Sequence, residues 1–328
     1  MPTVTESTIS ATGSPDYSTL QTWEDAAPAN LVTADAVWKG VIQEITDNFT
    51  TATATLLVSG STTDATRYKW LTVKDGSSFA DLSTNHLRYD ESQGASIATT
   101  AASNAPVHSN ENYFRMDRVQ VSSGTSSAGP VAGTGDILSF DNCLFESNHT
   151  SGDIVLPSGT RFDNSIMIMN TGGGVKSMSV TGGEVFINNS TIVTPADQTK
   201  SSRGIDVSSG GFVTGNNVAI FGATVDANGV GHTFTTSRSD DATPHTGITT
   251  TTFDTTTGSG FIDINKATLD LRLNSTSAMV TGGTDDATNA AADIFGTLRT
   301  LGSYGIGAFQ YAAAAAGAVA ILFRRRRR

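Results

Sequence analysis

A short sequence frame recurs through the middle of the chain: an apolar residue, one further residue, an asparagine and then alternating apolar residues. The frame occurs four times, with its asparagine at Asn142, Asn164, Asn189 and Asn217. An earlier stretch, from Met116 to Val121, fits the frame with Arg118 in place of the asparagine. The successive intervals are 24, 22, 25 and 28 residues. A period in the twenties with one strong strand per repeat predicts a β-solenoid, whose coils bury their apolar side chains by stacking.

The recurring asparagine has a predicted structural role in such a stack. Its amide can hydrogen-bond the equivalent asparagine one coil above and below, and it can satisfy the backbone of a tight bend. Asparagine is common in this chain, so chance is the alternative explanation, but four matches in one frame favour a ladder. Glycine-rich connections at 171–174 and 208–211 supply turns between strands.

Composition supports a mainly β fold. Charged residues are 16% and aromatic residues 7% of the chain, and Gly, Ser, Thr and Asn recur throughout, which argues against a helical bundle. The formal charge is −11, and without the five C-terminal arginines 15 basic residues face 31 acidic ones, so the body should repel nucleic acid. An acidic surface is compatible with calcium or neutral glycans, although solubility alone accounts for it. No cofactor or metal is predicted, since the five histidines lack ligand spacing and Cys143 is the only cysteine.

The N-terminal part has a different pattern of apolar residues. Large apolar side chains at an i, i+3, i+6 spacing are Tyr17, Leu20 and Trp23. This spacing predicts a short helix, capped by Asp16 or Ser18 and followed by a first strand. Because the bare end of a stack promotes edge-to-edge aggregation, we expect residues 1–45 to cap the first coil.

The rest of the chain divides by composition. Alternating stretches at 54–58 and 70–74 predict further strands, although their repeat phase is not visible. The predicted β-helix spans 46–310. Within it, a Thr-rich interval at 225–260 has few apolar residues and predicts a protrusion of the kind that often carries function. Residues 311–328 form a separate apolar and arginine-rich tail.

Two stretches near the end carry a family resemblance. Residues 270–283 read DLRLNSTSAMVTGG, similar to a "DFRL…SPAID.G" turn, and 293–311 contain segments similar to "D.G..R" and "DIGA[YF]E". Such motifs close right-handed parallel β-helix proteins, a family that includes pectate-lyase-like enzymes and many phage and surface proteins. Here Gly305 replaces the usual Asp and Gln310 the usual Glu. Both replacements remove charge, which predicts that this end is covered in the assembly.

The start of the chain carries a second resemblance. Residues 16–23 and 30–32 are similar to the opening of uncharacterised β-helix proteins found in marine phage and prophage gene neighbourhoods. Together the two resemblances imply an all-β, right-handed parallel β-helix with an N-terminal cap. They bear on the fold and hardly on activity.

The sequence offers only a few candidates for an active site. On this fold, lyases use an acidic calcium site with an Arg or Lys base, and hydrolases use clustered aspartates with a nearby histidine. The nearest candidates are Asp240 and Asp241 with Arg238 and His245, and the pair Asp285 and Asp286. No carboxylate is expected to recur at strand positions, so catalysis is the minority interpretation. Four aromatic residues could stack on sugar rings, namely Trp38, Trp70, Tyr113 and Phe114. Core packing is the commoner role of such residues.

The C-terminal tail is the most specific local feature. An Ala-rich apolar run extends from Tyr311 to Phe323 and is followed by Arg324, Arg325, Arg326, Arg327 and Arg328. A helix of this run would be roughly 20 Å long, at about 1.5 Å per residue, which is short of the ~30 Å hydrocarbon core of a membrane. The alternatives are a thinned membrane span and a socket helix that packs on a partner, with the arginines on an acidic surface, phosphate or nucleic acid.

These features predict a phage virion structural protein, such as a fibre, spike or decoration protein. Its β-helix would project towards a host surface glycan or receptor, and residues 311–328 would bind other virion proteins. Residues 1–14 lack a secretory signal, and phage proteins need none. The β-helix fibres of phages are often trimeric, so a homotrimer is one alternative for the assembly. The alternatives are a cell-surface or outer-membrane adhesin held by its tail, and a polysaccharide lyase or hydrolase.

Overall fold

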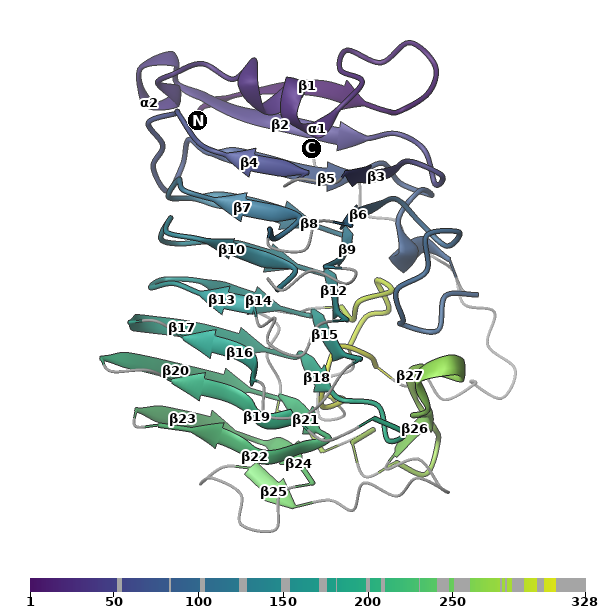
Figure 1. Cartoon of the computed structure of the whole chain (residues 1–328). Helices are drawn as coiled ribbons and strands as arrows, with labels where there is room; N and C mark the ends of the chain where they lie inside the picture. Colours follow the sequence, from purple (N-terminus) through teal and green to yellow (C-terminus); the bar gives the residue numbers. More distant parts are fainter. Residues whose placement is uncertain are drawn as a thin grey trace.

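The computed structural model describes residues 1–51, 55–82, 84–100, 104–123, 129–148, 154–170, 176–180, 182–198, 201–207, 210–229, 231–240, 248–250, 260–277, 279–280, 282–284, 292–299 and 304–310. Within these residues, short parallel strands stack coil upon coil into a rod (Figure 1). The predicted all-β parallel β-helix is therefore confirmed.

Two faces of the rod are sheets of nine described strands each. Sheet I contains, in order, β1 (Thr3–Ile9), β2 (Ala36–Ile42), β5 (Lys69–Val73), β8 (Phe114–Asp117), β11 (Ser139–Asp141), β14 (Arg161–Asp163), β17 (Gly183–Asn188), β20 (Gly211–Asn216) and β23 (His232–Thr235). Sheet II contains β3 (Asn48–Thr51), β6 (Ser96–Thr99), β9 (Gln120–Ser122), β12 (Leu144–Ser147), β15 (Ile166–Met169), β18 (Thr191–Val193), β21 (Ala219–Phe221), β24 (Ser237–Ser239) and β25 (Ile248–Thr250).

The third face is divided into two shorter parallel sheets. One contains β4 (Leu56–Val58), β7 (Val107–Ser109) and β10 (Val131–Gly133). The other contains β13 (Ile154–Leu156), β16 (Lys176–Val180), β19 (Ser201–Val207) and β22 (Ala223–Asn228). The seven coils from β2 to β22 therefore contribute one strand to each face.

The bend between sheets I and II explains the recurring frame. The asparagines of the frame have left-handed backbones, with φ of 53°, 49°, 48° and 55° at Asn142, Asn164, Asn189 and Asn217. Arg118 and Thr236 take the same conformation at the equivalent bends, with φ of 59° and 51°. Asparagine is among the few residues that adopt this conformation at low cost, so the bend itself selects it.

Aromatic rings fill the interior of the middle coils. The rings of Phe140 and Phe145 lie 5.3 Å apart in an edge-to-face arrangement, and Phe162 lies 5.6 Å from Phe145. At the equivalent position further along the rod the frame has Gly215, where a Cβ would come within 2.4 Å of the Phe234 ring. The ring thus occupies the space that a side chain at this position would fill.

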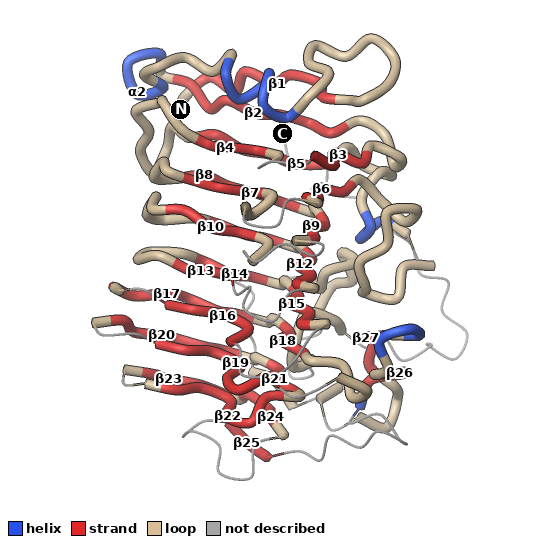
Figure 2. Tube along the Cα trace, in the orientation of Figure 1, coloured by secondary structure: helices blue, strands red, loops and turns tan. Residues whose placement is uncertain are grey.

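The N-terminal end is covered by two short helices (Figure 2). They are α1 (Leu20–Asp25) and α2 (Leu31–Ala34). The predicted helix is present, but its N-cap is Thr19 and not Asp16 or Ser18, because the Thr19 side chain accepts the Thr22 amide. The fully buried Trp23 of α1 packs over Gly40 of β2, so the helix seals the first coil.

A buried charge cluster joins this cap to the coils below it. The Lys69 ammonium lies 2.5 Å from a Glu24 carboxylate oxygen and 2.9 Å from one of Glu111. All three side chains are at least 95% buried. Burial raises the pKa of Glu24, and the hydrogen bond from Lys69 opposes this shift.

The described part of the Thr-rich interval at 225–260 continues the rod. The sequence predicts a protrusion there, whereas β23, β24 and β25 continue the two nine-stranded sheets. Threonine and serine suit the alternating positions of a strand, so the low apolar content of these three strands is compatible with the rod. The parts of this interval at 241–247 and 251–259 lie outside the described residues.

The C-terminal segment lies along the side of the rod. Strands β26 (Phe261–Asp263) and β27 (Asp270–Leu273) pair antiparallel, with a 3-10 turn, η3 (Lys266–Thr268), between them. The described residues at 282–284, 292–299 and 304–310, here called the strap, then run over the asparagine bends. Resemblance predicts closing turns in this segment, whereas its described strands do not extend the parallel stack. Among the described residues, every helix is too short or too polar to span a membrane.

Candidate functional site

The parallel register of sheet I aligns outward side chains into rows along the rod. Side chains alternate between the two faces of a strand, so equivalent residues of successive strands lie side by side at about 4.8 Å. The first row consists of Glu6, Lys39, Trp70, Arg115, Ser139, Arg161, Phe186, Thr214 and Thr233. It therefore mixes cations with aromatic rings.

The second row is dominated by carboxylates and amides. In register, its members are Asp117, Asp141, Asp163, Asn188, Asn216 and Thr235. Three aspartates thus stand on three neighbouring strands, which corrects the expectation that no carboxylate recurs at strand positions. The signal was present in the frame itself, where aspartate fills the position between the apolar residue and the asparagine, or Arg118, in three repeats.

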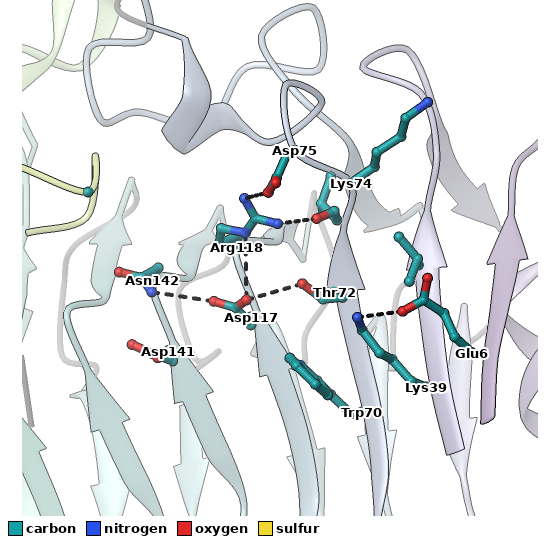
Figure 3. A pocket seen from close by; sticks show the side chains of 13 residues that line it. Glu6, Lys39, Trp70, Thr72, Lys74, Asp75, Asp117, Arg118, Asp141 and Asn142 are labelled. Carbon is teal, nitrogen blue, oxygen red and sulfur yellow. Dashed lines mark hydrogen bonds and ion pairs between the residues drawn. The ribbon is translucent and has the colours of Figure 1, made fainter. Parts of the chain in front are cut away.

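A groove of about 830 Å³ lies over the N-terminal half of these rows (Figure 3). Its lining residues are Glu6, Lys39, Val41, Trp70, Thr72, Val73, Lys74, Asp75, Asp117, Arg118, Asp141, Asn142 and Gly296. Strands β1, β2, β5, β8 and β11 of sheet I supply its floor, and Gly296 of the strap also lines it. The groove is therefore polar, with one partly exposed indole ring.

The first-row charges of the groove are paired with each other. The Lys39 ammonium lies 2.7 Å from Glu6 and 4.6 Å from the centre of the Trp70 ring. The lysine is thus held between a carboxylate and an aromatic face, which is a favourable position for a cation.

Arg118 organises the centre of the groove. Its guanidinium lies 2.8 Å from Asp75 and 3.6 Å from Asp117, and it also donates to the backbone carbonyl of Val73. Asp117 in turn accepts hydrogen bonds from the Thr72 hydroxyl at 3.1 Å and the Asn142 amide at 3.3 Å. The Asp117 carboxylate is thereby fixed in orientation, which a binding or catalytic carboxylate requires.

A second hollow of about 480 Å³ continues along the same face. It is lined by Arg161, Phe186, Asn188, Thr214, Asn216, Thr235 and Thr284. Arg161 donates to Asp163 at 3.0 Å and lies over the Phe186 ring at 5.5 Å. The Asn188 amide donates to the same aspartate at 2.7 Å. The two hollows together follow most of the length of sheet I.

The strap forms one wall of this surface. The Asn217 amide donates to the Thr284 carbonyl at 2.8 Å, and the Asn164 amide donates to the Ala292 carbonyl at 3.0 Å. Arg299 donates to the Asn164 amide oxygen at 3.1 Å. Hydrogen bonds to the asparagines of the bends therefore hold the strap against the rod.

A buried aspartate holds the strap together. Asp293 accepts backbone hydrogen bonds from Phe295, Thr297 and Gln310, at distances of 2.7–3.0 Å. Burial raises its pKa to about 6, although the three hydrogen bonds and Arg299 oppose the shift.

The residues predicted as catalytic have other positions. Asp240 lies at the end of β24, where its carboxylate accepts the Gly222 amide of the neighbouring coil at 2.9 Å. Asp241, His245, Asp285 and Asp286 lie outside the described residues, as does the tail at 311–328. Of the candidate sugar-stacking residues, Trp38 and Phe114 are buried, and Trp70 lines the groove. In the described part of the chain, no three His, Cys, Asp or Glu side chains are grouped to hold a metal ion.

Architecture places the chain among parallel β-helix proteins. No family model matches the sequence, and no curated protein matches it. The fold is similar to that in a crystal structure of pectate lyase Pel9A, with a TM-score of 0.44 and 10% identity over 84% of this chain and 88% of that chain. Similarity at this distance concerns the fold, and it carries no argument about activity.

Proposed function

We propose that the protein binds an extended glycan along the outer face of sheet I. The observation that carries this proposal is the pair of in-register rows, which place an indole ring, charged groups and amides in one elongated groove. Aromatic faces pack against the apolar faces of sugar rings, and carboxylates and amides exchange hydrogen bonds with hydroxyl groups. The groove offers both kinds of contact.

The spacing of the coils supports a polymer over a small molecule. Neighbouring strands lie about 4.8 Å apart, which is close to the length of one pyranose unit in an extended chain. A glycan along the rod would therefore meet the outward side chains of one further strand at each unit. A long shallow groove fits this mode of binding better than it fits a compact ligand.

The wider setting proposed from the sequence is a phage virion, in which the rod attaches to host surface glycans. Residues 311–328 would anchor it to other virion proteins. Electron microscopy of particles from the encoding genome, with an antibody to this chain, tests that setting. Recovery of the protein in host membranes without particles would instead favour a cell-surface adhesin.

Binding is tested with the full chain on an array of bacterial surface polysaccharides, followed by titration calorimetry on the best ligand. We expect Trp70→Ala to weaken binding by about 10- to 100-fold, because it removes an aromatic contact of about 1.5–3 kcal/mol. Ile262→Ala is the matched control, since Ile262 is exposed on β26 and lines neither hollow. Absence of any polysaccharide ligand, or equal affinity of the Trp70→Ala variant, would contradict the proposal.

A second candidate function, glycan cleavage, is favoured by the aspartate row. Asp117 and Asp141 are register partners on adjacent strands, whose backbones lie about 4.8 Å apart. Retaining glycosidases hold two carboxyl groups about 5–5.5 Å apart. Release of reducing ends from the bound glycan, lost in Asp117→Asn and Asp141→Asn variants that still bind, would support this function. A ligand that stays intact over days would exclude it.

A further inference from the structure

We infer that the groove takes glycans without acidic groups, that is, polymers of neutral or amino sugars, and discriminates against uronic acids and sulfated sugars. This inference rests on the proposed function. It concerns the sign of the charges that a bound polymer would meet along sheet I.

The first argument is the charge of the larger hollow. Its acidic side chains outnumber its basic ones, and the acidic members are Glu6, Asp75, Asp117 and Asp141. The basic members are Lys39, Lys74 and Arg118. The groove thus has an excess of negative charge, and so does the body of the chain. Both repel an anionic polymer as it approaches.

The second argument is that the cations are already engaged. Lys39 is paired with Glu6 at 2.7 Å, and Arg118 with Asp75 at 2.8 Å. Recognition of a carboxylate or sulfate is strong when an arginine is free to make a two-pronged contact. In this groove such a contact would require breaking an existing pair.

The third argument is the position of the remaining cations. In the second hollow Arg161 is paired with Asp163 at 3.0 Å. Lys74 is exposed, and Figure 3 shows its side chain extending away from Asp117 and Trp70. Arg115 of the first row is exposed and lies over the Tyr68 ring, 3.9 Å from its centre. An acidic group held over the aspartate row would therefore face Asp117 and Asp141, with Arg118 engaged by Asp75 and Arg115 by the Tyr68 ring.

The size of the discrimination follows from Coulomb's law. Two like charges about 5 Å apart at a partly hydrated surface repel enough to reduce affinity by about tenfold per charge. An amino group at the same place gains a comparable attraction. A polymer that repeats its acidic group at every unit would be repelled at each aspartate of the second row.

The experiment changes the charge of the ligand and keeps its backbone. The tightest-binding neutral polysaccharide from the array is oxidised at its primary hydroxyls, which converts them to carboxylates without altering the linkages. We expect the oxidised polymer to bind at least tenfold more weakly, and the loss to shrink at high salt because salt screens exposed charges. The double variant Asp117→Asn with Asp141→Asn should recover most of the loss.

The outcomes separate this inference from the proposed function. If the tightest ligand of the array is itself a uronic acid polymer, or if oxidation leaves the affinity unchanged, the charge selectivity is refuted and glycan binding stands. If no polysaccharide binds, both fall. The variants keep side-chain size, and circular dichroism verifies that they are folded.

Discussion

The side-chain amide of Asn217 donates a hydrogen bond of 3.0 Å to the amide oxygen of Asn189 one coil earlier. Both residues have left-handed backbones, with φ of 55° and 48°. Two requirements therefore favour asparagine at position 217, namely the left-handed conformation of the bend and the hydrogen bond between stacked amides. The strap adds a third demand, because the backbone amide of Thr284 donates to the Asn217 side-chain oxygen at 2.8 Å.

Replacing Asn217 tests these demands separately. We expect Asn217→Ala to lower the free energy of unfolding by about 2–4 kcal/mol, because it strains the bend and leaves buried partners unpaired. Asn217→Gly loses the same hydrogen bonds but tolerates the bend, so it should be about 1 kcal/mol more stable than the alanine variant. Urea denaturation measures both, and equal stabilities of the two variants would contradict the role of the bend.

The buried cluster of Lys69, Glu24 and Glu111 predicts a large effect at the N-terminal cap. Lys69→Met should destabilise the protein by about 3–5 kcal/mol, because it leaves two buried carboxylates without a cation. Adding Glu24→Gln and Glu111→Gln to Lys69→Met removes the uncompensated charges and should restore part of the loss. Thermal melting of the single and triple variants checks this, and a single variant as stable as the parent would contradict it.

Asp293 makes the stability of the strap depend on pH. Its pKa is raised from 3.8 to about 6 by burial, so the folded strap binds a proton that the unfolded chain releases. Its contribution is therefore fully present below about pH 3.8 and is lost as pH rises through about 6. The change amounts to about 3 kcal/mol for a shift of this size. Hydrogen exchange of the strap amides between pH 4 and 7 measures it.

The control for this prediction is Asp293→Asn, which cannot titrate. We expect the asparagine variant to have a looser strap, since its amide nitrogen would face the Gln310 amide that Asp293 now accepts. The opening free energy of its strap should nevertheless vary less with pH than that of the parent. Parallel profiles for the two proteins would rule out Asp293 as the source of the pH dependence.

Gly215 and Phe234 form a complementary pair in the core. Gly215→Ala should cost about 1–3 kcal/mol, because the new methyl group would collide with the Phe234 ring. Phe234→Leu alone opens a cavity and is also destabilising. The double variant should be more stable than the sum of the single effects predicts, and a double-mutant cycle in urea measures this coupling. Strict additivity would contradict the contact.

The sequence was sufficient for the fold because the bend is a local constraint. A residue with a left-handed backbone, followed by a buried strand, must recur once per coil. Asparagine occupies this position at Asn142, Asn164 and Asn189. The strap could not be foreseen in the same way. Arg299 and Asn164 are 135 residues apart and are joined by a hydrogen bond that no local pattern announces.

Part of the groove can be predicted from the sequence. Asp141 and Asp163 stand beside the asparagines that revealed the coils, but their importance depends on which face of the strand they occupy. That face follows from register, since a residue one position from a buried phenylalanine must point outwards. The sequence identifies Trp70 as a candidate sugar-stacking residue. Its neighbours Lys39 and Glu6 come from strands whose position in the repeat the sequence does not show.

The rows of sheet I have a consequence for how such a protein can change over time. Each strand of sheet I contributes one residue to the first row and, from β8 onwards, one to the second. Gain or loss of a single coil therefore lengthens or shortens the contact surface by one step and leaves the chemistry of every other step intact. The length of the contact surface and its selectivity for a ligand can therefore vary separately in descendants of this chain. The length changes with the number of coils, and the selectivity changes when outward side chains are substituted.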